Sequence, residues 1–159
     1  MLLLFVLINA VFDQGTTTPT TVIVVGGLPV ATNNPTLTAC QLPGFPPADI
    51  ASGLIVPQGA LPAGPVNHHS GDPGSFDCSR AVSAPYGQAK ILGFYDNHLR
   101  GLGWTNFSRG NAPNGGGSQF LYEKAGSDTF NWIEGVTVTS TEGSRTTWTV
   151  RLYQDNSLT

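Results

Sequence analysis

Residues 129–153 read TFNWIEGVTVTSTEGSRTTWTVRLY, and this stretch decides the fold because apolar side chains recur at every second position. A period of two is typical of a β-strand with one buried face. The residues on the apolar face are Phe130, Trp132, Val136, Val138, Trp148, Val150 and Leu152. The sequence therefore predicts two strands, over residues 129–140 and 145–153, joined as a hairpin through residues 141–143.

Upstream of this hairpin lie one further strand and one helix. Residues 118–124 also alternate, with Phe120 and Tyr122 on one face. Residues 86–102 change to a helical period, which places one set of apolar side chains on a single face. That set is Ile91, Leu92, Tyr95, Leu99 and Leu102. The predicted fold class is α+β: an antiparallel β-sheet, built as a meander and covered by one main α-helix.

The N-terminal part of the chain differs in composition from this body. Residues 13–63 are rich in Pro, Thr and Gly, which favours an extended segment. Residues 64–84 predict two weak strands. We therefore expect three parts: an apolar membrane anchor or partner-inserted segment over residues 1–12, an extended linker or clamp arm over 13–63, and a globular α+β domain over 64–159.

Charge is scarce and unevenly placed along the chain. Charged residues make up 11% of the 159 residues, against about 25% in an average soluble domain. Residues 1–63 contain only two charged side chains, Asp13 and Asp49, and the first basic residue is Arg80. A net charge of −3 without any run of Lys or Arg argues against nucleic acid and against electrostatic docking on anionic lipid.

The first twelve residues, MLLLFVLINAVF, contain a single polar side chain, Asn9. Twelve residues are too few to cross a bilayer, which takes about 20, and the basic flank of a secretory signal is missing. Three interpretations stay open: part of a transmembrane helix, a cleaved signal core, or a helix packed into a partner. We expect a retained anchor formed by Leu2, Leu3, Leu4, Phe5, Val6, Leu7, Ile8, Val11 and Phe12.

Two features of the arm indicate attachment. The β-branched run TVIVV predicts a strand that pairs with a partner edge through Val22, Ile23, Val24 and Val25. The chain has two cysteines, Cys40 and Cys78, and an even count in an exported chain predicts one disulfide. Residues 37–40, LTAC, also match a bacterial lipobox, and lipidation there would leave Cys78 unpaired.

The helical segment VSAPYGQAKILGFYDNHLRGLGW, residues 82–104, contains the pattern FYxxxLxxxGW. A Pro-rich lead, LPGFPPADIASGLIVPQGA, precedes it over residues 42–60. With the strands that follow, this arrangement resembles small exported or membrane-anchored bacterial α+β domains that combine such a helix with a β-meander. The resemblance covers roughly residues 42–153. It implies a fold and an extracytoplasmic location, and it carries over no catalytic residue.

Polar clusters that could bind a metal or form a catalytic triad are better explained as structure. His68 and His69 would point to opposite faces of a strand, so a metal site with Asp72 or Asp77 is not expected. A triad of Ser70 or Ser79 with His98 and Asp96 lacks the GxSxG elbow around its serine. The Gly-rich loop over residues 110–118 lacks the Lys of a P-loop.

Glu134 is the one acid on the apolar face of the predicted hairpin. A carboxylate buried there would have a raised pKa and could be functional, but we expect a bulge at Gly135 that turns Glu134 outward. The sequence therefore predicts no catalytic residue, no cofactor and no metal.

Together these features favour a non-enzymatic, membrane-anchored accessory or structural subunit of a larger membrane protein complex. It would lie on the extracytoplasmic side, periplasmic or cell-surface, and act in assembly or stabilisation. Its partners would be the membrane and membrane-protein subunits, and neither nucleic acid nor a small-molecule ligand is expected. Two alternatives stay open: a free exported domain that binds a small molecule or glycan in a pocket of Tyr122, Tyr153 and the 110–117 loop, and a filament-forming structural subunit.

Overall fold

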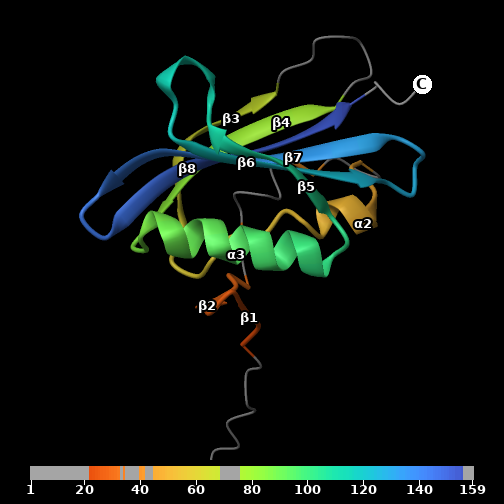
Figure 1. The fold of residues 1–159 in the computed structure, drawn as a ribbon. Coiled ribbons are helices and arrows are strands. Elements are labelled where there is room, and N and C mark those ends of the chain that lie inside the picture. The colour runs from red at the N-terminus through yellow and green to blue at the C-terminus, as the bar shows by residue number, and fades with distance from the viewer. Residues whose placement is uncertain (1–21, 33, 35–39, 42–44, 69–75, 156–159) are drawn as a thin grey trace, which may run out of the picture.

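The computed structural model describes residues 22–32, 34, 40–41, 45–68 and 76–155. Six strands form one antiparallel sheet, and a separate two-stranded hairpin lies nearby. Figure 1 shows the long helix α3 across one face of the sheet, with the hairpin on the side of α3 that faces away from the sheet. The elements are β1 Val24–Val25, β2 Leu28–Pro29, α2 Ala48–Ala51, β3 Leu61–His68, β4 Asp77–Ala84, α3 Gln88–Gly101, β5 Thr105–Asn111, the 3₁₀ turn η1 Pro113–Gly115, β6 Ser118–Ala125, β7 Asn131–Glu142 and β8 Arg145–Asp155.

The sheet has the strand order β3-β4-β8-β7-β6-β5. The predicted hairpin forms its centre, where Val136 pairs with Val150 and Val138 pairs with Trp148. These side chains point toward α3 and are buried, as the alternating pattern requires. The α+β class, the antiparallel sheet and its covering helix are therefore confirmed.

One strand of the sheet was not anticipated from the sequence. β5, which reads TNFSRGN, pairs with β6 at the edge of the sheet and is exposed at most positions. An edge strand of this kind buries little, so it shows no period of two. At the other end of the meander, Phe130 lies outside β7 and is 43% exposed, so it is not part of the predicted apolar face.

Large aromatic side chains fill the space between the sheet and α3. Trp132, Trp148, Tyr95 and Tyr122 are all fully buried. The indole nitrogen of Trp148 donates a hydrogen bond of 3.0 Å to the hydroxyl of Tyr95, which fixes α3 against β8. Such pairs combine a large apolar area with a satisfied polar atom.

The described part of the arm packs against α3. Phe94, which lies off the predicted apolar face of the helix, is fully buried because this side of α3 is covered as well. Gly26 approaches the helix so closely that a Cβ on it would lie 2.9 Å from the carbonyl oxygen of Gly93. Leu28, Ile50, Leu54 and Val56 are buried and belong to the same core.

These contacts change the predicted division of the chain at residue 64. Residues 28–56 contribute core side chains, and the predicted boundary falls inside β3. Where it is described, the segment from 22 to 63 is thus part of the folded domain and is not a free extended linker. Most of the residues described in this segment lie outside helices and strands, as its Pro and Gly content predicts.

Candidate functional site

The predicted partner strand forms a small hairpin within its own chain. Val24 pairs with Pro29 and Val25 pairs with Leu28. The turn between them consists of Gly26 and Gly27, whose φ angles of +55° and +80° are easily adopted only by glycine.

The outer edge of this hairpin is apolar and exposed. The exposed fractions are 56% for Val22, 64% for Ile23 and 59% for Val24. Ile23 also lines a shallow hollow of about 300 Å³ together with Val30, Ala31 and Thr32. Within the described residues no strand pairs with the free edge of β1. We call Val22, Ile23 and Val24 the apolar edge.

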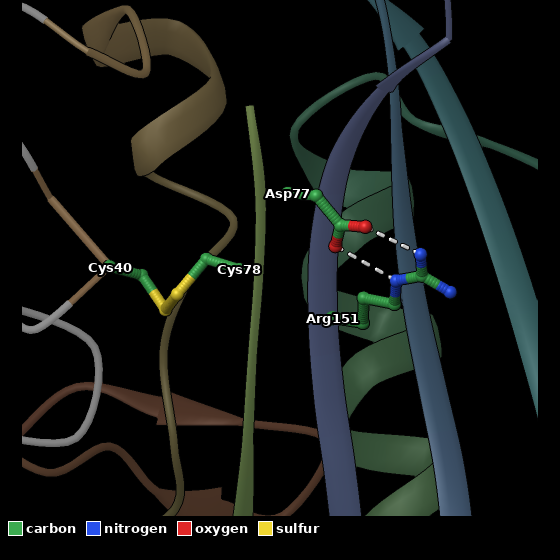
Figure 2. The surroundings of a disulfide bond; sticks show 4 residues. All are labelled: Cys40, Asp77, Cys78 and Arg151. Carbon is green, nitrogen blue, oxygen red and sulfur yellow. Dashed lines mark hydrogen bonds and ion pairs between the residues drawn. A yellow bond between two sulfur atoms is a disulfide. The ribbon is translucent and has the colours of Figure 1, made fainter. Parts of the chain in front are cut away.

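A disulfide joins Cys40 to Cys78, as the sequence predicted. The S–S distance is 1.95 Å and the Cα atoms are 5.7 Å apart. Both residues are buried, and Cys78 lies in β4 next to the centre of the sheet. Figure 2 shows that the bond ties the arm to one side of β4, while Asp77 projects to the other side. Cys40 is therefore paired, and lipidation of Cys40 does not describe this state.

The predicted anchor residues, Leu2 to Phe12, lie outside the described residues. No helix in the part of the chain that the structure describes is long and apolar enough to cross a bilayer.

The side chain of Glu134 points in the direction opposite to the one predicted from the sequence. The prediction that a bulge at Gly135 turns this acid outward is wrong, because the ladder is regular there: Glu134 pairs with Tyr122 and Leu152, and Gly135 with Leu121 and Arg151. The register shift in β7 falls instead between Val138 and Ser140. Glu134 therefore points toward α3 and is fully buried.

The environment of Glu134 is apolar and tight. Neither carboxylate oxygen has a hydrogen-bond partner among the described residues. A Cβ on Gly53 would lie 2.5 Å from Oε2 of Glu134 and 3.2 Å from Cδ2 of Leu99, so a side chain there would force the acid to shift. Burial raises the pKa of Glu134 to about 8. The acid is therefore held as a neutral carboxyl over much of the physiological pH range.

The opposite, outer face of the sheet contains a hollow of about 430 Å³. Its lining residues follow two rows across β6, β7 and β8. The first row, Gln119, Thr137 and Thr149, is polar and uncharged. The second row is Leu121, Gly135 and Arg151. Pro113 and Tyr153 complete the lining.

Arg151 is held in place beside this hollow. Its Nε and Nη2 donate to Oδ1 and Oδ2 of Asp77 at 2.9 and 2.6 Å, as Figure 2 shows. The guanidinium carbon lies 4.8 Å from the centre of the Tyr153 ring. The pair is bidentate, so the two charges compensate each other and the guanidinium is fixed in orientation.

The pocket expected from Tyr122, Tyr153 and the 110–117 loop is only partly assembled. Tyr153 and Pro113 line the hollow, whereas Tyr122 is fully buried on the helix face. There its hydroxyl donates a 2.8 Å hydrogen bond to Asp96. Asp96 also accepts hydrogen bonds from Arg100 and Arg109, so this acid clamps α3 to the edge of the sheet.

The triad and metal groupings considered from the sequence are not brought together. His98 is hydrogen-bonded through Nε2 to the carbonyl of Ser52 at 2.9 Å, and Ser79 lies on the outer face of β4, opposite Arg151. Ser70, His69 and Asp72 lie outside the described residues. Among the residues that the structure describes, no group of three His, Cys, Asp or Glu side chains could hold a metal.

Two of these features were missed from the sequence. The period of two correctly places Glu134 inside and Gly135 outside, but the prediction let a bulge at Gly135 override the period. Following the alternation alone would have found the buried acid, whereas the hollow also depends on side chains of β6 and β8 that pair beside Gly135.

Comparison with known proteins adds no information about the family or function of this chain. No family model matches this chain, and neither a curated protein nor a solved structure is significantly similar to it.

Proposed function

We propose that this chain is a non-catalytic, membrane-anchored accessory subunit of a larger membrane protein complex. It is displayed on the extracytoplasmic side and acts in assembly or stabilisation. The observation that carries the proposal is the apolar edge, where three aliphatic side chains are each more than half exposed.

The disulfide supports an extracytoplasmic location. Disulfides form and persist in oxidising compartments and are rare in the cytosol. The Cys40–Cys78 bond also fastens the arm to β4, so that the hairpin is carried on a rigid body. A pre-organised edge costs less conformational entropy when a partner binds it.

The geometry of the hairpin suits strand addition by a partner. Val24 and Val25 pair with Leu28 and Pro29 on one side, and the other side of β1 offers backbone groups to a partner strand. An apolar edge of this kind is also a liability for a free domain, because exposed strand edges promote aggregation. A subunit whose edge is covered in its complex avoids that liability.

The test uses the full chain in its native membrane, with a photo-crosslinking residue in place of Ile23. We expect adducts with a membrane protein after detergent solubilisation. The matched control carries the crosslinker in place of Leu61, an exposed aliphatic residue of β3 that is 60% exposed. Equal adducts from both positions, or none from Ile23, would exclude the apolar edge as the contact.

A second measurement separates anchoring from partner contact. After an alkaline carbonate wash, which removes proteins held only by a partner, deletion of residues 1–21 is expected to move the protein from the membrane fraction to the soluble fraction. The triple substitution Val22→Thr, Ile23→Thr and Val24→Thr is expected to leave membrane association intact and to abolish the adducts. Membrane association that survives the deletion would contradict the anchor.

A further inference from the structure

The hollow on the outer face of the sheet has the features of a binding site, and the proposed function leaves it unused. Its volume of about 430 Å³ falls within the range of about 300–1,000 Å³ that small-molecule sites occupy. It lies on β6, β7 and β8, the central part of the sheet, where the backbone is firmly paired on both sides. A site on such strands is rigid before a ligand arrives.

The floor of the hollow is formed by Gly135. Its neighbours across the ladder are Leu121 and Arg151, and a Cβ at this position would lie 3.1 Å from Cδ2 of Leu121. The side chain of Leu121 therefore leans over Gly135 and gives the hollow an apolar wall beside the backbone of β7.

The polar groups of the hollow are uncharged or compensated. Gln119 donates through Nε2 to Oγ1 of Thr137 at 2.9 Å, which leaves its carbonyl oxygen and the Thr137 hydroxyl hydrogen for a ligand. Thr149 pairs with Thr137 across the ladder and adds a second hydroxyl. Asp77 engages Nε and Nη2 of Arg151, so Nη1 keeps its donors.

These properties select the chemical class of the ligand. An anion would find only the Nη1 donors of Arg151, whose charge Asp77 already compensates, and an acyl chain would leave the Gln119–Thr137–Thr149 row without hydrogen bonds. A pyranose ring presents apolar C–H faces and hydroxyls that both donate and accept. We propose that the hollow over Gly135 binds a neutral saccharide unit. Such an open site with few contacts gives weak affinity, with a Kd of about 1–10 mM.

The test is a titration of the full chain, labelled with ¹⁵N, with cellotriose, maltotriose and tri-N-acetylchitotriose in separate experiments. At least one of the three is expected to shift the amide signals of Gln119, Gly135, Thr137 and Thr149 with saturation. Acetate serves as the anionic probe and is expected to leave these signals in place. The proposal is overturned if no saccharide shifts them, or if acetate produces the same pattern.

Two variants locate the site within the hollow. Gly135→Val fills the floor, and Thr137→Val removes one hydroxyl while keeping the shape of the side chain. Each is expected to weaken saccharide binding roughly tenfold or more. Gly101→Ala is the matched control. A Cβ at Gly101 meets nothing within 4 Å, and Gly101 lies in α3, on the side of the sheet opposite the hollow. Unchanged binding in Thr137→Val, with its spectrum otherwise intact, would overturn the assignment.

Discussion

Strand β7 shows how differently the two faces of one sheet are used. Glu134 and Gly135 are neighbours, yet Glu134 points into the core beneath α3 while Gly135 leaves a hollow on the outer face. The helix face is closed by α3, the arm and the disulfide, and it holds an acid that has no hydrogen-bond partner among the described residues. The outer face has a hollow, and beside it the charges of Asp77 and Arg151 compensate each other in an ion pair. The buried core therefore lies on one face of the sheet, and the open hollow lies on the other.

The largest effect is expected from the disulfide, which closes the helix face. The bond joins residues 38 positions apart, and closing a loop of that length stabilises a fold by about 4 kcal/mol. The pair Cys40→Ser and Cys78→Ser should lower the free energy of unfolding by that amount in urea denaturation. Amide exchange should speed up most in residues 45–58, the part of the arm that follows Cys40 and contributes Ile50, Leu54 and Val56 to the core. If amide exchange on the outer face accelerates equally, the disulfide stabilises both faces alike and the proposed difference between them is wrong.

The next effect concerns Glu134 and its proton. The folded chain keeps this proton up to a pKa of about 8, whereas the unfolded chain releases it near 4.5. The unfolded state therefore binds fewer protons between these values, and stability falls as pH rises. From pH 5 to pH 8 the loss should be about 3–4 kcal/mol, or about 1.4 kcal/mol per pH unit. Urea denaturation at pH 5, 6.5 and 8 measures it.

A matched pair of acids checks that assignment. Glu134→Gln removes the titrating group and should flatten the dependence of stability on pH. Glu123→Gln, which lies on the outer face opposite Ile133, should leave the wild-type slope in place. A slope that survives Glu134→Gln would show that another group on the helix face holds the proton.

The smallest expected effect on stability comes from replacing one leucine by alanine, and we compare this substitution on the two faces of the sheet. Leu152 is fully buried on the helix face, and Leu121 borders the hollow on the outer face. Leu152→Ala should cost about 3 kcal/mol because it creates a cavity in a packed core. Leu121→Ala should cost about 1 kcal/mol or less, since solvent can fill the space. Similar losses measured by thermal unfolding would mean that the outer face is covered.

The alternation of side chains was sufficient to predict the centre of the sheet and its covering helix. Trp132, Val136, Trp148 and Val150 obey the period of two, and α3 obeys the helical period. Local periodicity succeeds at these positions because each element buries one face against one neighbour. The single disulfide also followed from a simple count of cysteines.

The remaining parts depend on packing that no local pattern encodes. Phe94 is buried only because the arm returns to cover a second side of α3, and Gly26 is required only because the hairpin meets Gly93 at close range. β5 forms because β6 offers an edge, and its own sequence carries no strand signal. The hollow arises where a glycine interrupts a row of side chains contributed by three strands.

The position of the disulfide also has a mechanical consequence. Cys78 belongs to β4, which is hydrogen-bonded on both sides to β3 and β8. A pulling force applied through the N-terminal segment would pass from Cys40 across the sulfur bridge directly into this strand. The chain between the two cysteines, which includes α2 and β3, would bear none of that load along its backbone. The crosslink thus protects the chain between the two cysteines from a force that pulls on the N-terminal segment.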